Sequence, residues 1–158
     1  MAKQEKTNVM RLLEQKKISY TMHDYTDSGA IAGEDVARVL GEEPDFVFKT
    51  LVTVGKSRQN YVFIVPVNKE LNLKKAASAV GEKSIEMIKS KELLPLTGYV
   101  HGGCSPIGMK KQFPTIVHSS AENMETIFFS GGKIGIQVEL KTEDFRKIVN
   151  IKFADVAD

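Results

Sequence analysis

Apolar side chains recur every three or four residues in several stretches of the chain, which is the spacing of an amphipathic helix. The first stretch follows a cap signal at Thr7, and the second and third stop at Gly41 and Gly81, a residue type that commonly ends helices. The pattern predicts helices over residues 8–16, from near Gly33 to Gly41, from a cap at Asn72 to Gly81, and over 142–150, with a broken helical turn over 90–98.

Other stretches are short, apolar and rich in β-branched residues, which is typical of strands. Residues 46–54 and 61–67 flank the polar segment GKSRQN and are predicted to form a hairpin. Pro66 places the second of them near a sheet edge or near its own end. Further strands are predicted at 84–88, 114–120, 124–130, 133–140 and 151–156, with an extended segment at 19–25 and a turn at Ser130-Gly131-Gly132.

The order of these elements indicates the fold class. Helices interrupt the strands irregularly, and no repeat, low-complexity tract or linker divides the chain. A chain of 158 residues that is 42% hydrophobic can bury one substantial core. We therefore predict a single α+β domain over residues 1–158, with a mixed, curved, barrel-like sheet flanked by helices.

Charge and cysteine content narrow the classes of protein. Twenty-two basic residues oppose twenty acidic ones, and a net charge of +2 neither requires nor excludes a nucleic-acid partner. Cys104 is the single cysteine, and no Cys/His spacing of the zinc-site kind occurs, so we expect no disulfide, no metal and no cofactor. The sequence has no signal-peptide core and no run of the ~20 apolar residues that a membrane span needs. A cytoplasmic protein without a membrane partner is expected.

Lys49 lies in the middle of the otherwise apolar strand 46–54, between Val47 and Leu51 on one strand face. An unpaired buried ammonium is unfavourable, so the head of this lysine must reach water, meet an anion or have a chemical task. Thr50 is adjacent and lies on the opposite face of a regular strand. A bulge, or the end of the strand, would let both side chains reach one pocket.

Two segments with glycines could also carry chemistry. In GYVHGGCSPIGMKK, Gly102, Gly103 and Gly108 leave backbone N–H groups open to a ligand, and Pro106 stiffens the loop. Such a loop can bind an oxyanion or a phosphate, although it matches neither the phosphate loop nor the dinucleotide fingerprint. In FFSGGKIG, Ser130 ends a strand, and the local pattern alone favours an ordinary hairpin turn.

Together these segments resemble the YbaK family of aminoacyl-tRNA editing proteins, in particular its Cys-tRNA(Pro) deacylase branch. The matching segments occur in the family's order over nearly the whole chain. They are FKTL (48–51), LNLKKAA (71–77), TGYVHGGCSPIGMKK (97–111), ETIFFSGGKIG (125–135) and the MHDY segment that ends at Tyr25. The resemblance implies a hydrolase related to the editing domain of bacterial prolyl-tRNA synthetases, which removes wrongly attached small amino acids.

The resemblance also implies the site. Lys49 is expected near the 3′-terminal adenosine and the ester of aminoacyl-tRNA, where a cation can bind a phosphate and stabilise charge on the carbonyl. The implied reaction needs no protein nucleophile, because the thiol of a cysteinyl ester attacks its own carbonyl and the protein supplies proximity. The other pocket residues that the resemblance implies are Tyr25, Thr50, Gly102, Gly103 and Ser130.

Other reactive side chains are not expected to act as catalysts. Cys104 occupies a loop position that is commonly small and aliphatic in the family, so we interpret it as compact apolar filling. His23 could support the pocket from the MHDY segment, but it could equally be hydrogen-bonded at a strand end. His101 and His118 receive no catalytic role.

Two other functions stay open. The chain could be a deacylase for Ala-tRNA(Pro), because selectivity for the side chain depends on pocket volume. It could also be a non-catalytic module that binds tRNA or a synthetase, although Lys49 and the intact GGCSPIG loop argue against this. The expected partner is aminoacyl-tRNA, bound through its 3′ CCA end, and prolyl-tRNA synthetase is a further candidate. The candidate contacts to tRNA phosphates are Lys74, Lys75, Lys110 and Lys111.

Overall fold

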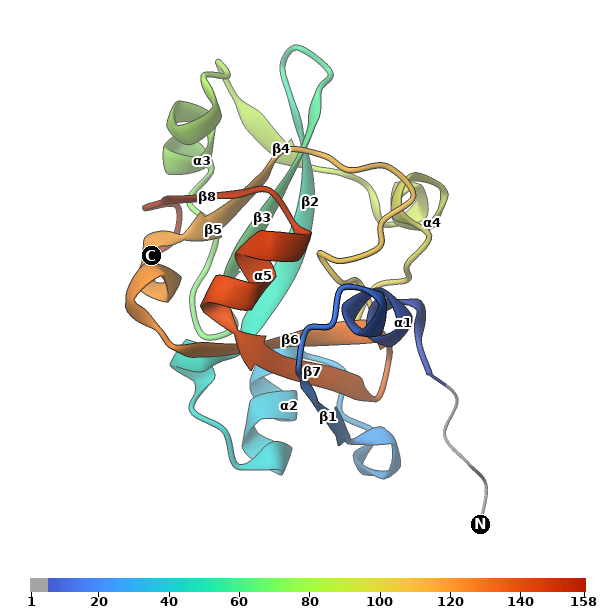
Figure 1. Cartoon of the computed structure of the whole chain (residues 1–158). Helices are drawn as coiled ribbons and strands as arrows, with labels where there is room; N and C mark the ends of the chain where they lie inside the picture. Colours follow the sequence, from blue (N-terminus) through green and yellow to red (C-terminus); the bar gives the residue numbers. More distant parts are fainter. Residues whose placement is uncertain (1–5) are drawn as a thin grey trace.

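Two β-sheets and five α-helices form residues 6–158, the part of the chain that the computed structural model describes (Figure 1). Residues 1–5, which the predicted domain includes, lie outside this part. The helices are α1 (Asn8–Gln15), α2 (Gly33–Leu40), α3 (Leu73–Val80), α4 (Ser90–Thr97) and α5 (Thr142–Ile148). The strands are β1 (Thr21–Asp24), β2 (Phe48–Gly55), β3 (Asn60–Pro66), β4 (Ile85–Met87), β5 (Thr115–His118), β6 (Thr126–Lys133), β7 (Ile136–Lys141) and β8 (Ile151–Ala154).

The larger sheet is mixed and the smaller one is antiparallel. The larger has the strand order β4-β2-β3-β5-β8, in which β3, β5 and β8 are mutually parallel, and the smaller has the order β1-β7-β6. A parallel bridge between Val47 and Phe128 joins the two sheets. The predicted α+β class is therefore confirmed, but the strands form two sheets joined by this bridge and not one barrel-like sheet.

The core explains why residues 61–67 read as a continuous apolar run. On one face of β3, Val62 and Ile64 pack in the main core with Phe129 and Phe145, whose rings lie 5.0 Å apart between centroids. On the other face, Phe63 and its neighbours pack under α3. Because β3 is buried on both faces, it shows no alternation of apolar and polar residues. No helix in residues 6–158 is both long and apolar enough to cross a bilayer.

Most predicted element ends agree with the structure. Thr7 and Asn72 accept capping hydrogen bonds at the starts of α1 and α3, and Gly41 and Gly81 are left-handed at the ends of α2 and α3. The predicted break in 90–98 is wrong, because α4 continues through Pro95. The proline removes one backbone donor from a short, exposed helix, a loss that water can compensate.

The turn predicted at Ser130-Gly131-Gly132 is also wrong. β6 continues to Lys133, and the turn to β7 lies at residues 134–135, where Gly135 has a φ of +98°. The two earlier glycines instead form an irregularity in β6, where its register with β7 shifts between Ser130 and Lys133. A glycine pair serves either feature, so the local pattern could not distinguish a turn from a bulge.

Candidate active site

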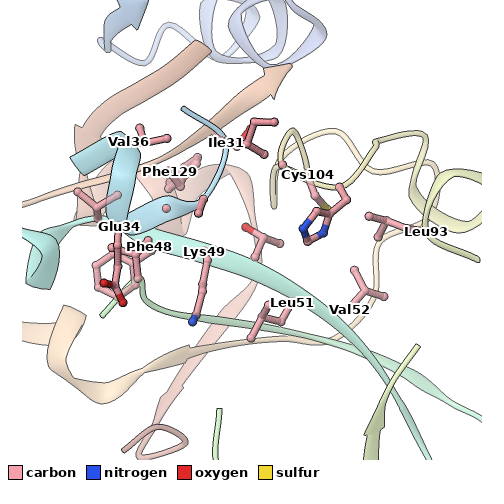
Figure 2. A pocket seen from close by; sticks show the side chains of 18 of the residues that line it. Ile31, Glu34, Val36, Phe48, Lys49, Leu51, Val52, Leu93, Cys104 and Phe129 are labelled. Carbon is pink, nitrogen blue, oxygen red and sulfur yellow. The ribbon is translucent and has the colours of Figure 1, made fainter. Parts of the chain in front are cut away.

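A cavity of about 690 Å³ opens beside the first half of β2. Its walls come from α2 and the segment before it, from β2, from the segment that joins β4 to α4, from the glycine loop after α4, and from β6 and β7. In Figure 2, Glu34 and Leu93 lie on opposite sides of this cavity, and Lys49 lies between them. A volume of this order is typical of small-ligand sites.

The edge of β2 at the cavity is only partly covered by another strand. β3 pairs with β2 along residues 48–54, whereas β4 pairs with the opposite edge only at residues 53–55. Residues 47–52 all line the cavity, so both faces of the strand reach it. The register with β3 is continuous, so no bulge is present in this part of β2. Lys49 and Thr50 share the cavity because the cavity lies along the start of the strand.

Lys49 buries much of its stem and brings its amine to the cavity. The side chain is 27% exposed, and Nζ lies 3.7 Å from Oε1 of Glu70, whose own side chain is 91% exposed. Water screens such a pair, so it contributes little to stability. The strand, and not a strong ion pair, therefore holds the Lys49 ammonium, which stays able to bind an anionic group.

Two buried oxygen atoms in the residues of the cavity wall have unmet hydrogen bonds. Thr50 Oγ1 and Gln137 Oε1 have no partner among residues 6–158. Nε2 of Gln137 donates to Oε1 of Glu42 over 2.8 Å, and a carboxylate only accepts, so the amide nitrogen must face Glu42. A buried polar atom without a partner costs about 1–3 kcal/mol. Both oxygens are closed to solvent, so a hydrogen-bond donor in the cavity would reach them only if the side chains that cover them moved.

Burial raises the pKa of the Glu42 carboxyl, and the hydrogen bond from Gln137 opposes this rise. The titratable groups that act on Glu42 are His23 and Glu139, which are themselves joined by a contact of 2.8 Å between Nε2 and Oε1. Glu42 thus lies in a polar cluster behind the cavity, and Gln137 connects this cluster to the cavity wall.

The glycine loop brings Gly102 to the cavity and keeps Gly103 behind it. Gly102 has a φ of +88°, and a Cβ there would lie 2.7 Å from Cγ2 of Ile31. The Gly103 N–H donates to the carbonyl of Val100 over 3.0 Å, and a Cβ there would lie 2.9 Å from the backbone nitrogen of Ile134. Gly103 is not one of the cavity-lining residues. Close packing of the loop on the β6–β7 turn explains its glycine.

Ser130 reaches the cavity from the irregular part of β6. Its Oγ accepts a hydrogen bond from the N–H of Gly132 over 3.1 Å, and Gly132 has a φ of +95°. Since the hydroxyl accepts in this contact, its hydrogen is free to donate to a ligand. The bulge thus fixes a donor at the cavity, a role that an ordinary hairpin turn would not have given to this residue.

Tyr25 lines the cavity where β1 ends. The residue is 6% exposed, and its backbone N–H donates to the carbonyl of Gly135 over 2.8 Å. Burial raises the pKa of the Tyr25 phenol, so the hydroxyl stays protonated at neutral pH. The structure therefore brings five of the six predicted site residues to one cavity: Tyr25, Lys49, Thr50, Gly102 and Ser130.

Cys104 also lines the cavity, but its thiol is not prepared for nucleophilic attack. The residue is 8% exposed, and burial raises the pKa of the thiol to about 12, which leaves little thiolate at neutral pH. Of the histidines, His101 lines the cavity, whereas His23 and His118 do not. Among residues 6–158, no three His, Cys, Asp or Glu side chains form a metal-binding group.

Sequence reasoning missed the wall that α2 and β7 contribute. Ile31, Glu34 and Val36 line the cavity from α2 and the segment before it, and Gln137 lines it from β7. The apolar periodicity of α2 predicts a helix but does not indicate what the helix covers. The position of Gln137 depends on Glu42, which lies 95 residues earlier, so no local signal could have identified it.

The geometry defines a mostly apolar cavity whose lining includes the lysines Lys49 and Lys89 and the free hydroxyl donor of Ser130, as a site for a small charged ester or phosphate would. A family model described as the aminoacyl-tRNA editing domain matches residues 28–148. The chain belongs to the aminoacyl-tRNA editing family, and its resemblance to the YbaK proteins is confirmed.

Individual relatives agree with this assignment. The chain is 46% identical, over 97% of its length and 94% of the relative's, to an Enterococcus faecalis (strain ATCC 700802 / V583) protein provisionally named Cys-tRNA(Pro)/Cys-tRNA(Cys) deacylase EbsC. It is 30% identical to proline–tRNA ligase of Shouchella clausii (strain KSM-K16), over 65% of this chain but 18% of the ligase. The fold also resembles a solved structure described provisionally as a trans-editing enzyme for prolyl-tRNA synthetase, with a TM-score of 0.82, 21% identity, and coverage of 98% of this chain and 99% of that one.

Proposed function

We propose that the chain is a trans-editing deacylase that hydrolyses the ester of mischarged Cys-tRNA(Pro), and that Cys-tRNA(Cys) is a further substrate. The observation that carries the proposal is one cavity that contains Lys49 and four other predicted site residues, in a chain 46% identical to EbsC. Residues 1–158 would act as one editing domain in the cytoplasm. Prolyl-tRNA synthetase is the proposed source of the mischarged tRNA, because a proline–tRNA ligase contains a segment similar to this chain.

Each site residue has a proposed task. The Lys49 ammonium binds the 3′-terminal phosphate or stabilises negative charge that develops on the ester carbonyl. Ser130, whose hydroxyl hydrogen is free, donates to the same end of the substrate. Thr50 Oγ1 and Gln137 Oε1, which are buried and without partners in the described part of the chain, accept hydrogen bonds from the α-ammonium of the amino acid or from the ribose once the side chains that cover them move. Gly102 allows the ester to approach the loop backbone closely.

The proposed reaction uses the sulfur of the substrate as the nucleophile. The cysteinyl thiolate attacks its own carbonyl carbon, the bond from that carbon to the ribose oxygen breaks, and the released oxygen takes up the proton that the thiol gave to solvent. The products are uncharged tRNA and a cyclic thiolactone, which water then opens to cysteine. Cys104 supplies no competing nucleophile, because burial raises its pKa to about 12. The cavity contributes proximity and electrostatic stabilisation, and the route uses no metal or cofactor.

The experiment that tests the proposal compares substrates on one tRNA. Purified protein is incubated with Cys-, Ala- and Pro-charged tRNA(Pro), and the loss of each aminoacyl group is followed over time. We expect rapid loss of cysteine, slow loss of alanine and no loss of proline. Preferred loss of alanine would make the chain an Ala-tRNA deacylase, and binding of tRNA without loss of any amino acid would make it a non-catalytic module.

A further inference from the structure

The two sides of the cavity carry opposite charge. On the α2 side, residues 24–45 contain seven acids (Asp24, Asp27, Glu34, Asp35, Glu42, Glu43 and Asp45) and one base, Arg38. Arg38 is itself paired with Asp35, with a contact of 2.8 Å between Nη2 and Oδ1. Glu34 and Asp35 line the cavity directly, as does the exposed Glu70. A polyanion that approached across this side would be repelled.

The α4 side is basic on balance: residues 86–111 contain the four lysines Lys89, Lys91, Lys110 and Lys111 against the two acids Glu86 and Glu92. Lys89 precedes α4 and lines the cavity, and Lys91 is exposed in the first turn. Lys110 is fixed at the other end of α4, where its N–H donates to the carbonyl of Thr97 over 3.0 Å. Lys111 follows it and is also exposed.

None of these four lysines has a carboxylate within 4.0 Å in the described part of the chain. The other lysine pair that the sequence offered for phosphates differs. Lys75 makes contacts of 3.0 Å with Asp155 and 2.8 Å with Asp158. Its charge is therefore already compensated. Of the two predicted pairs, only Lys110 and Lys111 lie on the cavity side that α4 forms.

We infer that the acceptor end of tRNA enters the cavity over α4 and the glycine loop, with its phosphates on Lys89, Lys91, Lys110 and Lys111, and away from the acidic side formed by residues 24–45. The inference rests on the proposed function, because it assigns a direction to the same substrate. Figure 2 shows how the two sides are arranged: Glu34 lies on one side of Lys49 and Leu93 of α4 on the other. The charges also match the ligand, since an aminoacylated end is a chain of phosphates that ends in one ammonium group.

The test measures how strongly tRNA binds when charges on the α4 side are reversed. The variants are Lys91→Glu and the double variant Lys110→Glu/Lys111→Glu, which leave the residues of the cavity wall intact. The matched control is Lys152→Glu: Lys152 is exposed on β8, at the opposite edge of the large sheet from β4 and α4. Binding of uncharged tRNA(Pro) is measured at several salt concentrations, and kcat and KM are measured with Cys-tRNA(Pro).

We expect the α4-side variants to bind tRNA roughly tenfold more weakly than the wild type at low salt, because each loses contacts to phosphates. The slope of log K against log salt concentration should become shallower by ~0.7 for each single-strand phosphate contact that is lost. KM should rise while kcat stays unchanged, and the control should stay within about twofold of the wild type. Cysteinyl adenosine, which lacks the phosphates, should be hydrolysed equally by all variants.

Equal tRNA affinity in all variants, or an equal loss in Lys152→Glu, would overturn the inferred path even if the wild type deacylates Cys-tRNA. Failure of the wild type to deacylate any substrate would instead refute the proposed function. The binding measurements with uncharged tRNA would still decide the path in that case, because they do not depend on hydrolysis.

Discussion

Gln137 donates a hydrogen bond from Nε2 to Oε1 of Glu42 over 2.8 Å, yet each of these side chains keeps one buried oxygen without a partner in the described part of the chain. The pair therefore has one hydrogen bond and two unmet acceptors. Burial raises the pKa of Glu42 above its ordinary value of 4.5, which is the expected response of a carboxyl with this environment. The pair links the polar cluster around His23 to the wall of the cavity.

The first prediction is that Glu42→Gln stabilises the protein at neutral pH. The new amide keeps an acceptor for Gln137 and removes a charge that burial disfavours, and burial is the largest cause of the raised pKa of Glu42. Because the folded pKa of Glu42 is raised, the wild type loses stability as the pH rises from about 4.5 through the folded pKa. The advantage of the variant in thermal unfolding should therefore be largest near pH 7 and disappear near pH 4.

The control for this prediction is Glu43→Gln, at an adjacent and exposed carboxyl. It removes the same charge without touching Gln137, so its melting temperature should follow that of the wild type at both pH values. An equal gain in both variants would show that overall charge, and not the Glu42–Gln137 pair, governs the effect.

Lys49→Ala should nearly abolish deacylation and leave the fold intact. Its pair with Glu70 is long and screened, so the fold loses little when the amine is removed. Lys49→Arg should also fail, because a planar guanidinium does not replace a compact ammonium in the cavity. Single-turnover deacylation of Cys-tRNA, together with circular dichroism, measures both effects. Near-normal turnover by the alanine variant would remove Lys49 from the mechanism.

Cys104→Ala should keep most of the activity, because the reactive thiol is proposed to belong to the substrate. The buried Cys104 thiol, with a pKa of about 12, is protonated throughout the working range of pH. The measurement is kcat/KM for Cys-tRNA between pH 6 and 9, with mass spectrometry of the protein during turnover. An acyl group trapped on Cys104 would make the protein a cysteine-nucleophile enzyme instead.

Gly102→Ala and Gly29→Ala form a matched pair of substitutions in the left-handed backbone region. Gly102 has a φ of +88° and Gly29 a φ of +73°, so each alanine should cost about 1 kcal/mol of stability. Only the Cβ at Gly102 would meet Ile31, at 2.7 Å, whereas the Cβ at Gly29 has nothing within 4 Å. Both variants should melt at lower temperature, but only Gly102→Ala should lose deacylation, by about tenfold or more. Equal activity in the two variants would contradict the role of the loop.

Local sequence patterns predicted most of the helices and strands. Caps such as Thr7 and Asn72 and terminal glycines such as Gly81 fix where a helix begins or ends within a few residues, and they act through short-range hydrogen bonds and backbone freedom. The division into two sheets was not predictable in this way, since it depends on the bridge between Val47 and Phe128, 81 residues apart along the chain. The glycines at 131 and 132 allow two backbone solutions, and tertiary pairing selects the bulge.

The candidate site also has a part that the sequence indicates and a part that only the tertiary structure determines. A lysine inside an apolar strand is anomalous wherever the strand packs, so Lys49 is noticeable in the sequence, but it was the resemblance to the YbaK family that implied a place for it in the site. The walls that oppose it could not, because Glu34 and Leu93 come from helices whose position relative to β2 is set by the whole core. Gly103 shows the limit of motif reasoning: its glycine is explained by close packing against the backbone of Ile134 rather than by exposure to the cavity.

The last prediction concerns the thiol of the substrate. If the cavity supplies orientation and charge while the cysteinyl sulfur attacks, hydrolysis must depend on sulfur chemistry as well as on side-chain size. Serine is nearly isosteric with cysteine, so a size filter would separate them poorly, but a hydroxyl is hardly ionised near neutral pH. We therefore expect Cys-tRNA to be hydrolysed far faster than Ser-tRNA, S-alkylated Cys-tRNA to be inert, and a thiolactone to precede free cysteine when products are followed by mass spectrometry. Comparable rates for Ser-tRNA and Cys-tRNA, with solvent oxygen in the cysteine and no thiolactone, would identify an activated water in the same cavity as the nucleophile.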